Sequence, residues 1–379
     1  MVTLIDDGGL VVRGALYPRP DYAGKPWSQW GQGIILGDGR YLSAIGDHHG
    51  ADGNSFVYEY DPASGVLTQI IDVLSLTDHV SGDWGYGKVH GQMVAGPCND
   101  VLFGTYWGTR KDLVYNDSYA GDRLFRIDPA TATVEDLGVL AEARGLPSMA
   151  SWPSGGLIYA EAVDPTQSPK DGEFVAVDAK SGEVVFSDGD TSHVGFRAMA
   201  VDAEGRAYFS VGEGQLAVFD PSTLSVSEYP GVLPGGWLRA ATAPAPDGTI
   251  FAVTREPDVL FSMTPDGDVS ELVAARGYIA SMVADPEGET VYYVPDAHGR
   301  SFMQGTPLIA VDTQTGEDRV VVEMNAAAED VLGVRLGGSY NVAITPDGGT
   351  IYVGMNAGPV SGDGGSFGEV VLLEITLPR

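Results

Sequence analysis

Imidazole, guanidinium and phenol groups are the side chains of this sequence that could do proton chemistry on a negatively charged substrate. Histidine titrates near neutral pH, so it can accept or donate a proton, and arginine pairs with carboxylates through two parallel hydrogen bonds. The chain has six histidines. Two segments concentrate such groups: Gly46 to Asn54, which contains His48 and His49, and Trp84 to Gln92, which contains His90.

One reaction uses this combination of groups. Cleavage of a uronate glycoside by β-elimination needs a cation or strong donor on the carboxylate, a base for the C5 proton and an acid for the leaving oxygen. Hydrolysis by the usual glycosidase route needs two carboxylates across a cleft. With 52 aspartates and glutamates in the chain, the position of any one of them carries little information. The residue types therefore favour elimination, with histidine or tyrosine as base and acid.

A repeated pentapeptide predicts the scaffold that would hold these groups. One copy reads Val-Tyr-Glu-Tyr-Asp and ends at Asp61, and another reads Leu-Phe-Arg-Ile-Asp and ends at Asp128. The remaining copies end at Asp178, Asp220, Thr264, Asp312 and Thr376, and consecutive copies among all seven end 42 to 67 residues apart. A repeat of this length, built of strands and turns, is typical of a propeller blade. We predict an all-β, seven-bladed β-propeller of four-stranded antiparallel blades, formed by residues 1–379 as a single domain.

Each predicted blade has strands a to d, numbered from the axis outward, and the pentapeptide is strand c. Its closing aspartate is expected to cap the turn that follows. No strand d follows Thr376, so the stretch Gly9 to Gly14 is expected to supply it and close the ring. The expected b strands are Tyr41–Gly46, Val101–Tyr106, Leu157–Ala162, Ala207–Gly212, Ile250–Arg255, Val291–Asp296 and Ile351–Asn356.

The long connections, such as Asn325 to Asn341, are expected on one face of the ring, and long loops on a rigid scaffold often carry function. The histidines fall on this face or at its edge, at His48, His49, His79, His90, His193 and His298. Aligning the blades places His90 and Arg239 at equivalent heads of strand a, with Arg197 and Tyr340 one residue later. We interpret this as an anion-binding pocket at the mouth of the axial channel. Channel water with carboxylate partners is the alternative.

The first two predicted blades resemble a known group of enzymes. His-His-Gly, the later Tyr-Glu-Tyr-Asp-Pro, Lys-Val-His-Gly-Gln at 88–92 and Gly-Thr-Tyr-Trp-Gly at 104–108 are similar to motifs of the seven-bladed propeller polysaccharide lyases, namely the ulvan lyases and the rhamnose–glucuronate lyases. The resemblance is motif-like from about Gly31 to Asp128. It implies that histidines, a tyrosine and an arginine near the axis carry out the elimination.

Together these observations give a set of expected site residues. The expected catalytic residues are His49, His90, Tyr106 and Arg197. The expected substrate-binding residues are His48, Gln92, Trp107, Arg110, Arg239, His298 and Tyr340. The expected partner is an acidic oligo- or polysaccharide that is cleaved next to glucuronate. No cofactor is required. A structural calcium ion held by Asp47, Asp52 and Asn54 stays open.

Composition and charge limit which other partners and which cellular locations we expect. A net charge of −31 repels nucleic acid and anionic membranes, and no apolar run approaches the roughly 20 residues that span a bilayer. The start of the sequence lacks the basic and apolar regions of a signal peptide, which favours the cytoplasm by default and leaves a secreted mature form open. The single cysteine, Cys98, excludes an internal disulfide. We expect a monomer.

Two other functions fit a propeller. One is a metal-assisted hydrolase or lactonase, which would hold a divalent ion at the axis through carboxylates. The other is a non-catalytic propeller that binds glycan or peptide, because fold alone does not choose between these. A scaffold of the WD type is disfavoured because its Gly-His and Trp-Asp signature is missing.

Overall fold

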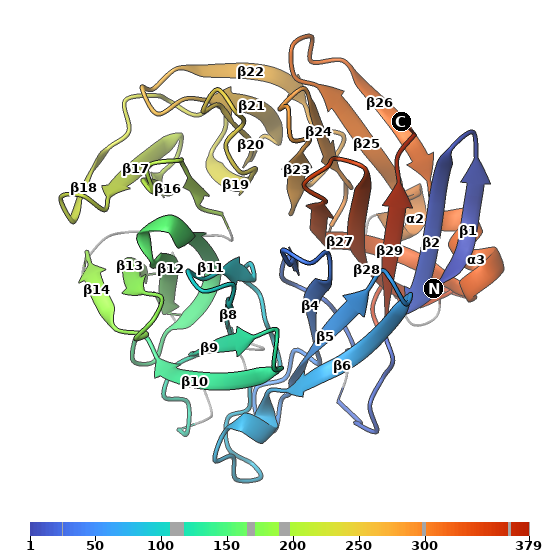
Figure 1. Cartoon of the computed structure of the whole chain (residues 1–379), viewed down its shortest axis with the longest axis horizontal. Coiled ribbons are helices and arrows are strands. Elements are labelled where there is room, and N and C mark those ends of the chain that lie inside the picture. Colours follow the sequence, from blue (N-terminus) through green and yellow to red (C-terminus); the bar gives the residue numbers. More distant parts are fainter. Residues whose placement is uncertain are drawn as a thin grey trace.

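The computed structural model describes residues 1–24, 26–106, 117–164, 171–188, 198–297, 301–362 and 365–378. In this part of the chain, seven antiparallel sheets are arranged in a ring around a central axis (Figure 1). Six sheets have four strands and the seventh has five. This is the seven-bladed propeller that the pentapeptide repeat predicts.

In the first six blades the strands follow one another in chain order from the axis outward. The first two blades contain β3 (Ile34–Ile35), β4 (Tyr41–Gly46), β5 (Ser55–Asp61) and β6 (Val66–Asp72), then β7 (Val94–Ala95), β8 (Val101–Gly104), β9 (Arg123–Asp128) and β10 (Thr133–Val139). The next two contain β11 (Gly145–Trp152), β12 (Leu157–Asp164), β13 (Asp171–Asp178) and β14 (Val184–Ser187), then β15 (Ala200–Val201), β16 (Ala207–Gly212), β17 (Gln215–Asp220) and β18 (Ser225–Glu228). The fifth and sixth contain β19 (Trp237–Ala241), β20 (Ile250–Arg255), β21 (Val259–Met263) and β22 (Val269–Ala274), then β23 (Met282–Ala284), β24 (Thr290–Tyr293), β25 (Pro307–Asp312) and β26 (Asp318–Glu323).

The seventh blade closes the ring with the N-terminal strands. From the axis outward it contains β27 (Val334–Ile344), β28 (Thr350–Pro359), β29 (Glu369–Thr376), β2 (Leu10–Leu16) and β1 (Val2–Asp7). Strand β2 pairs with β29 from Val11 opposite Thr376 to Leu16 opposite Val371, and Figure 1 shows the blue strands beside the red one. The predicted closure is confirmed, whereas β1 is an additional fifth strand that we did not predict.

The core lies between neighbouring blades. Leu42 and Val57 of the first blade pack in one cluster with Phe103 and Phe125 of the second. Because the inner strands are covered on both faces, they read in sequence as nearly continuous apolar runs rather than as alternating ones. Strand β4, for example, is buried along its whole length.

The predicted strand bounds hold for β4, β16 and β20 and differ by a few residues for the other b strands. The expectation of a long loop from Asn325 to Asn341 is wrong. Its first part is the helix α3 (Asn325–Leu332), and its second part belongs to β27. Three alanines, a glutamate and a leucine favour the helix, and Gly333 ends it in the left-handed conformation, with φ of 72°. A shorter helix, α2 (Ser301–Gln304), precedes β25.

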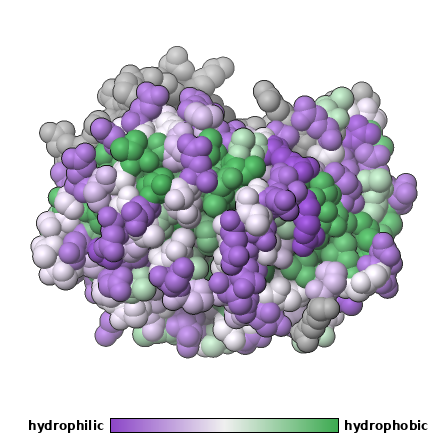
Figure 2. Space-filling model, turned by 90° about the horizontal axis from the view of Figure 1, so that it is seen from above, coloured by the Kyte–Doolittle hydropathy of each residue, from purple (hydrophilic) through white to green (hydrophobic). Residues whose placement is uncertain are grey.

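The aspartates that end strand c cap their turns as predicted. At each of the five aspartates, the carboxylate accepts a hydrogen bond from the backbone N–H two residues later, and at Asp178 and Asp312 from the N–H three residues later as well, at 2.7–3.1 Å. The flank of the ring shows apolar patches between hydrophilic side chains (Figure 2). Among the described helices, none is long and apolar enough to cross a membrane.

Candidate functional site

A buried carboxylate orders the loop that follows β4. Asp47 is 1% exposed and accepts hydrogen bonds from the Tyr22 hydroxyl and from the backbone N–H groups of His49, at 2.9 Å, and Asn54, at 3.3 Å. Burial raises the pKa of the Asp47 carboxyl above its ordinary value. The carboxylate therefore ties both ends of the loop to the same point.

The segment Trp84 to Gln92, which contains Lys88 and His90, runs as extended chain beside β8. The Tyr106 N–H donates to the Lys88 carbonyl at 2.9 Å, and Val89 forms a β-bridge with Thr105. Side chains alternate in an extended chain, so Lys88 and His90 lie on the same side of it. The Lys88 ammonium and the His90 imidazole are thus on the same side of this segment.

The two segments touch through their backbones. The N–H of His48 donates to the carbonyl of Gly87 at 2.8 Å. A Cβ at Gly87 would lie 2.2 Å from Asp47 Oδ1 and 2.6 Å from the His49 carbonyl oxygen, so a larger residue would push the segments apart. His48 itself has a φ of 62°, a left-handed conformation that is uncommon outside glycine and often marks functional loops.

The contact brings together five side chains, which we call the histidine cluster: Trp30, His48, Lys88, His90 and Tyr106. The Lys88 Nζ atom lies 2.7 Å from His48 Nε2. It also lies 4.4 Å from the centroid of the Trp30 ring and 5.3 Å from that of Tyr106. Lys88 is 5% exposed, whereas His48 is half-buried.

His90 is held in one tautomer by the neighbouring blade. Its Nδ1 atom lies 2.8 Å from the carbonyl oxygen of Pro147, which lies where the register of β11 shifts between Gly145 and Ser148. A carbonyl oxygen only accepts, so Nδ1 carries the hydrogen and Nε2 holds the lone pair of the neutral ring. The ring centroid is 4.4 Å from that of Tyr106. This arrangement suits a general base.

Arg239 and Tyr340 are placed by β-bulges. The pairing of β19 with β20 skips Arg239, and the pairing of β27 with β28 skips Tyr340. A bulge bends its strand and re-aims the side chain of the extra residue. The guanidinium of Arg239 donates through Nε to the Tyr278 hydroxyl at 2.5 Å and through Nη1 to the Ala280 carbonyl at 3.4 Å.

An aromatic path links Arg239 to the histidine cluster. Tyr340 belongs to a small buried cluster against which Trp30 and Tyr278 also pack. The ring centroids of Trp30 and Tyr340 are 5.0 Å apart, and the guanidinium of Arg239 lies 4.9 Å from the ring centroid of Tyr278. Two cations, Lys88 and Arg239, therefore contact aromatic side chains of this group, Trp30 and Tyr278 respectively.

The other expected site residues take different positions. His49 is exposed beside the cluster, and its backbone N–H binds Asp47. Gln92 lies deeper along the axis, where its Oε1 atom accepts from the Met149 N–H at 3.1 Å. Trp107, Arg110, Arg197 and His298 lie outside the described residues.

Lys88 and Trp30 are central to the site, yet neither is among the site residues predicted from the sequence. The alternation of side chains two residues before His90 could have indicated Lys88. Trp30 is more distant in sequence, and no comparable signal points to it.

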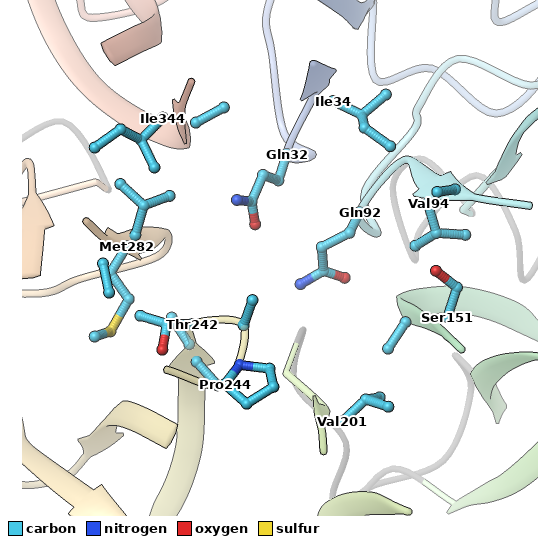
Figure 3. Close-up of a pocket in the computed structure, with 18 of the residues that line it drawn as sticks. Gln32, Ile34, Gln92, Val94, Ser151, Val201, Thr242, Pro244, Met282 and Ile344 are labelled. Atoms are coloured by element: carbon cyan, nitrogen blue, oxygen red, sulfur yellow. The ribbon is translucent and has the colours of Figure 1, made fainter. Parts of the chain in front are cut away.

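A cavity of about 650 Å³ lies along the axis, but on the side of the a–b turns rather than at the histidines. Apolar side chains line it, including Val94, Met282 and Ile344. The amides of Gln32 and Gln92 point toward the axis in Figure 3. The cavity is therefore separate from the pocket that we expected on the histidine face.

The residues proposed to hold calcium already bind protein groups. Asp52 Oδ1 contacts His79 Nε2 at 2.8 Å and the Gly82 N–H at 2.9 Å, and the side-chain amide of Asn54 donates to Asp72 at 2.8 Å. Within the described residues, histidine, cysteine, aspartate and glutamate form no group of three that could hold a metal ion. The structure gives no support for the calcium site.

Comparisons with known proteins show the fold. No family model matches the sequence, and no curated protein matches it. Virginiamycin B lyase from Staphylococcus aureus has a similar structure, with a TM-score of 0.62, 10% identity, and coverage of 97% of this chain and 99% of that one. Its catalytically inactive histidine-to-alanine variant with quinupristin has a TM-score of 0.60 and 10% identity, and the match covers 97% of this chain and 99% of that one. U3-55K has a TM-score of 0.60 and 9% identity, and the match covers 96% of this chain and 98% of that one. At such identities the likeness is one of fold alone.

Proposed function

We propose that this propeller is a lyase that cleaves a uronate-containing oligo- or polysaccharide by β-elimination. The observation that carries the proposal is the fixed tautomer of His90, whose Nδ1 atom faces the Pro147 carbonyl oxygen at 2.8 Å. A neutral imidazole that carries its hydrogen on Nδ1 has its lone pair on Nε2, and a lone pair there matches the base that the reaction needs at neutral pH. The propeller fold, which it shares with another lyase, is consistent with this function but does not establish it.

The reaction assigns a role to each neighbouring group. His90 Nε2 takes the C5 proton, the C5–H electron pair forms the C4=C5 double bond, and the C4–O bond breaks. Tyr106, in ring contact with His90, donates its hydroxyl proton to the leaving oxygen. Cations on the same face stabilise the negative charge that develops on the carboxylate as the proton leaves.

Replacing His90 by alanine tests this assignment. We expect H90A to lose at least about 100-fold in kcat, the usual contribution of a general base, when a panel of uronate polysaccharides is assayed by the ultraviolet absorbance of the unsaturated product. H79A is the matched control, because His79 binds Asp52 rather than the cluster. Wild-type rates in H90A would refute the role of His90.

The same assay separates the alternatives. A metal-assisted hydrolase or lactonase would give products without the double bond and would lose activity in a chelator. A non-catalytic propeller would bind an oligosaccharide in calorimetry and release no product. Unsaturated product from the wild-type protein in the presence of a chelator would exclude both.

A further inference from the structure

The proposed proton transfers by His90 and Tyr106 do not involve the contact between Lys88 and His48. The Nζ and Nε2 atoms are 2.7 Å apart. A charged lysine ammonium has only hydrogens to offer, so it donates and His48 Nε2 accepts. The neutral ring of His48 then carries its hydrogen on Nδ1. His48 and His90 therefore share a tautomer, and in His48 the Nε2 atom accepts from Lys88.

The surroundings of Lys88 hold its charge inside the protein. The Nζ atom lies over the rings of Trp30 and Tyr106, at 4.4 and 5.3 Å from their centroids, where the negative faces of the rings attract a cation. The residue is 5% exposed. His48, which is half-buried, is more accessible to solvent than Lys88.

The backbone of His48 is fixed as well. Its N–H donates to the Gly87 carbonyl at 2.8 Å, and its left-handed φ of 62° is held by the loop that Asp47 ties together. A ring whose backbone and Nε2 atom are both bound is oriented before substrate arrives, which lowers the entropic cost of binding.

We infer that Lys88 and His48 form the carboxylate-recognition pair of the proposed lyase. His48 donates its Nδ1–H to the uronate carboxylate, and Lys88 supplies the positive charge behind the ring and fixes its tautomer. Lys88 is thus a positioning residue that acts through His48, and His90 is left as the base. The inference rests on the proposed function and names the part of the site that selects a uronate over a neutral sugar.

Because the overall charge is −31, an anionic substrate needs local positive charge at the site. A bare imidazole would bind a carboxylate weakly in this field. A charge-assisted hydrogen bond is roughly twice as strong as a neutral one, and burial protects the charge of Lys88 from screening by salt.

A nitrogen-15 NMR spectrum of the imidazole rings tests the contact without reference to activity. We expect His48, assigned by its loss in H48N, to show a bound hydrogen at Nδ1 and none at Nε2. Asparagine suits this control because it tolerates the left-handed backbone. In K88M the Nε2 signal of His48 should move toward that of a ring exchanging between tautomers. A wild-type His48 that carries its hydrogen on Nε2 overturns the inference.

Kinetics test the role in recognition. For a uronate oligosaccharide that the wild type cleaves, we expect K88M to lower kcat/KM by about 10- to 100-fold, as for the loss of a hydrogen bond to a charged group. For the methyl ester of the same substrate the loss should be less than about threefold, because the ester carries no charge for the pair to meet. K88R, which keeps the charge, should retain part of the discrimination.

The matched control is K180M, because Lys180 is exposed in a turn between strands c and d, and it should leave both substrates unaffected. Equal losses for acid and ester in K88M would assign Lys88 to the stability of the cluster and refute its role in recognition. If the wild type cleaves no uronate, the proposed function fails and carboxylate recognition fails with it, while the NMR spectra still decide whether Lys88 sets the tautomer.

Discussion

At the scale of single residues, Arg239 is the most unusual charge of the histidine face. It is 1% exposed, and in the part of the chain that the structure describes its Nη2 atom has no hydrogen-bond partner. Among the described residues, no carboxylate lies within ion-pair distance of its guanidinium, whereas Arg255 on the neighbouring strand pairs with Glu256 at 3.4 Å. A buried cation without an anion costs stability, and functional sites often carry such a cost. An anionic group of the substrate would complete its hydrogen bonds.

Replacing Arg239 by methionine should therefore separate stability from activity. We expect R239M to keep or raise the free energy of unfolding, by about 1 kcal/mol, because a buried charge is replaced by an apolar chain of similar length. We expect kcat/KM for the uronate substrate to fall by about 10-fold or more. Urea unfolding and the product assay measure the two effects.

R255M is the control for that experiment. Arg255 lies 5.1 Å from the same Tyr278 ring, but its side chain is 36% exposed, so its removal should not stabilise the protein. A marked loss of stability in R239M, together with unchanged activity, would make Arg239 a structural residue.

At the scale of elements, the sequence repeat predicts the strands well and their irregularities poorly. The b strands β4, β16 and β20 match their expected bounds, because both faces of a blade are buried and the apolar runs are continuous. The bulges at Arg239 and Tyr340 depend on which residue pairs with which across two strands. Patterns within a single strand carry no information on that pairing. The sequence therefore predicts which residues lie at equivalent heads of strand a, but not the directions of their side chains.

The turns after strand c make a prediction about acid stability. Backbone and hydroxyl hydrogen bonds from Ser181 hold the pKa of Asp178 below its ordinary value. A lowered pKa in the folded state adds stability above the unfolded pKa of about 3.9, and this stability is lost as the pH falls through the folded value. We expect D178N to unfold at lower urea concentration than the wild type at neutral pH, with the difference shrinking below about pH 4.

The fifth blade offers the control for that turn. Thr264 takes the place of the aspartate, and its hydroxyl accepts from the Asp268 N–H at 3.3 Å. T264A should therefore weaken its turn by an amount that is the same at neutral and at acidic pH. A difference between D178N and the wild type that persists unchanged in acid would contradict an electrostatic role for Asp178.

At the scale of the whole molecule, stability depends on one junction between the two ends of the chain. Val12 of β2 is fully buried among Ile351 and Leu373 of the seventh blade. Arg13 pairs with Glu374 at 3.0 Å, and Glu374 also accepts from Tyr60 of the first blade at 2.6 Å. The junction therefore joins the last blade to the first. It thereby also helps to hold Trp30, which precedes the first blade, beside Tyr340 of the last blade.

Truncation tests this junction. Removing residues 1–8 deletes β1, whose Leu4 and Ile5 are only partly buried, and should lower the unfolding midpoint modestly. Removing residues 1–16 also deletes β2, which exposes the backbone edge of β29 and the cavity left by Val12. We expect this longer truncation to aggregate or to unfold without cooperativity. A synthetic peptide of residues 1–16 should restore it by adding the missing strand. If the longer truncation unfolded at the midpoint of the shorter one, ring closure by β2 would contribute nothing to stability, and the candidate site would owe its shape to the individual blades alone.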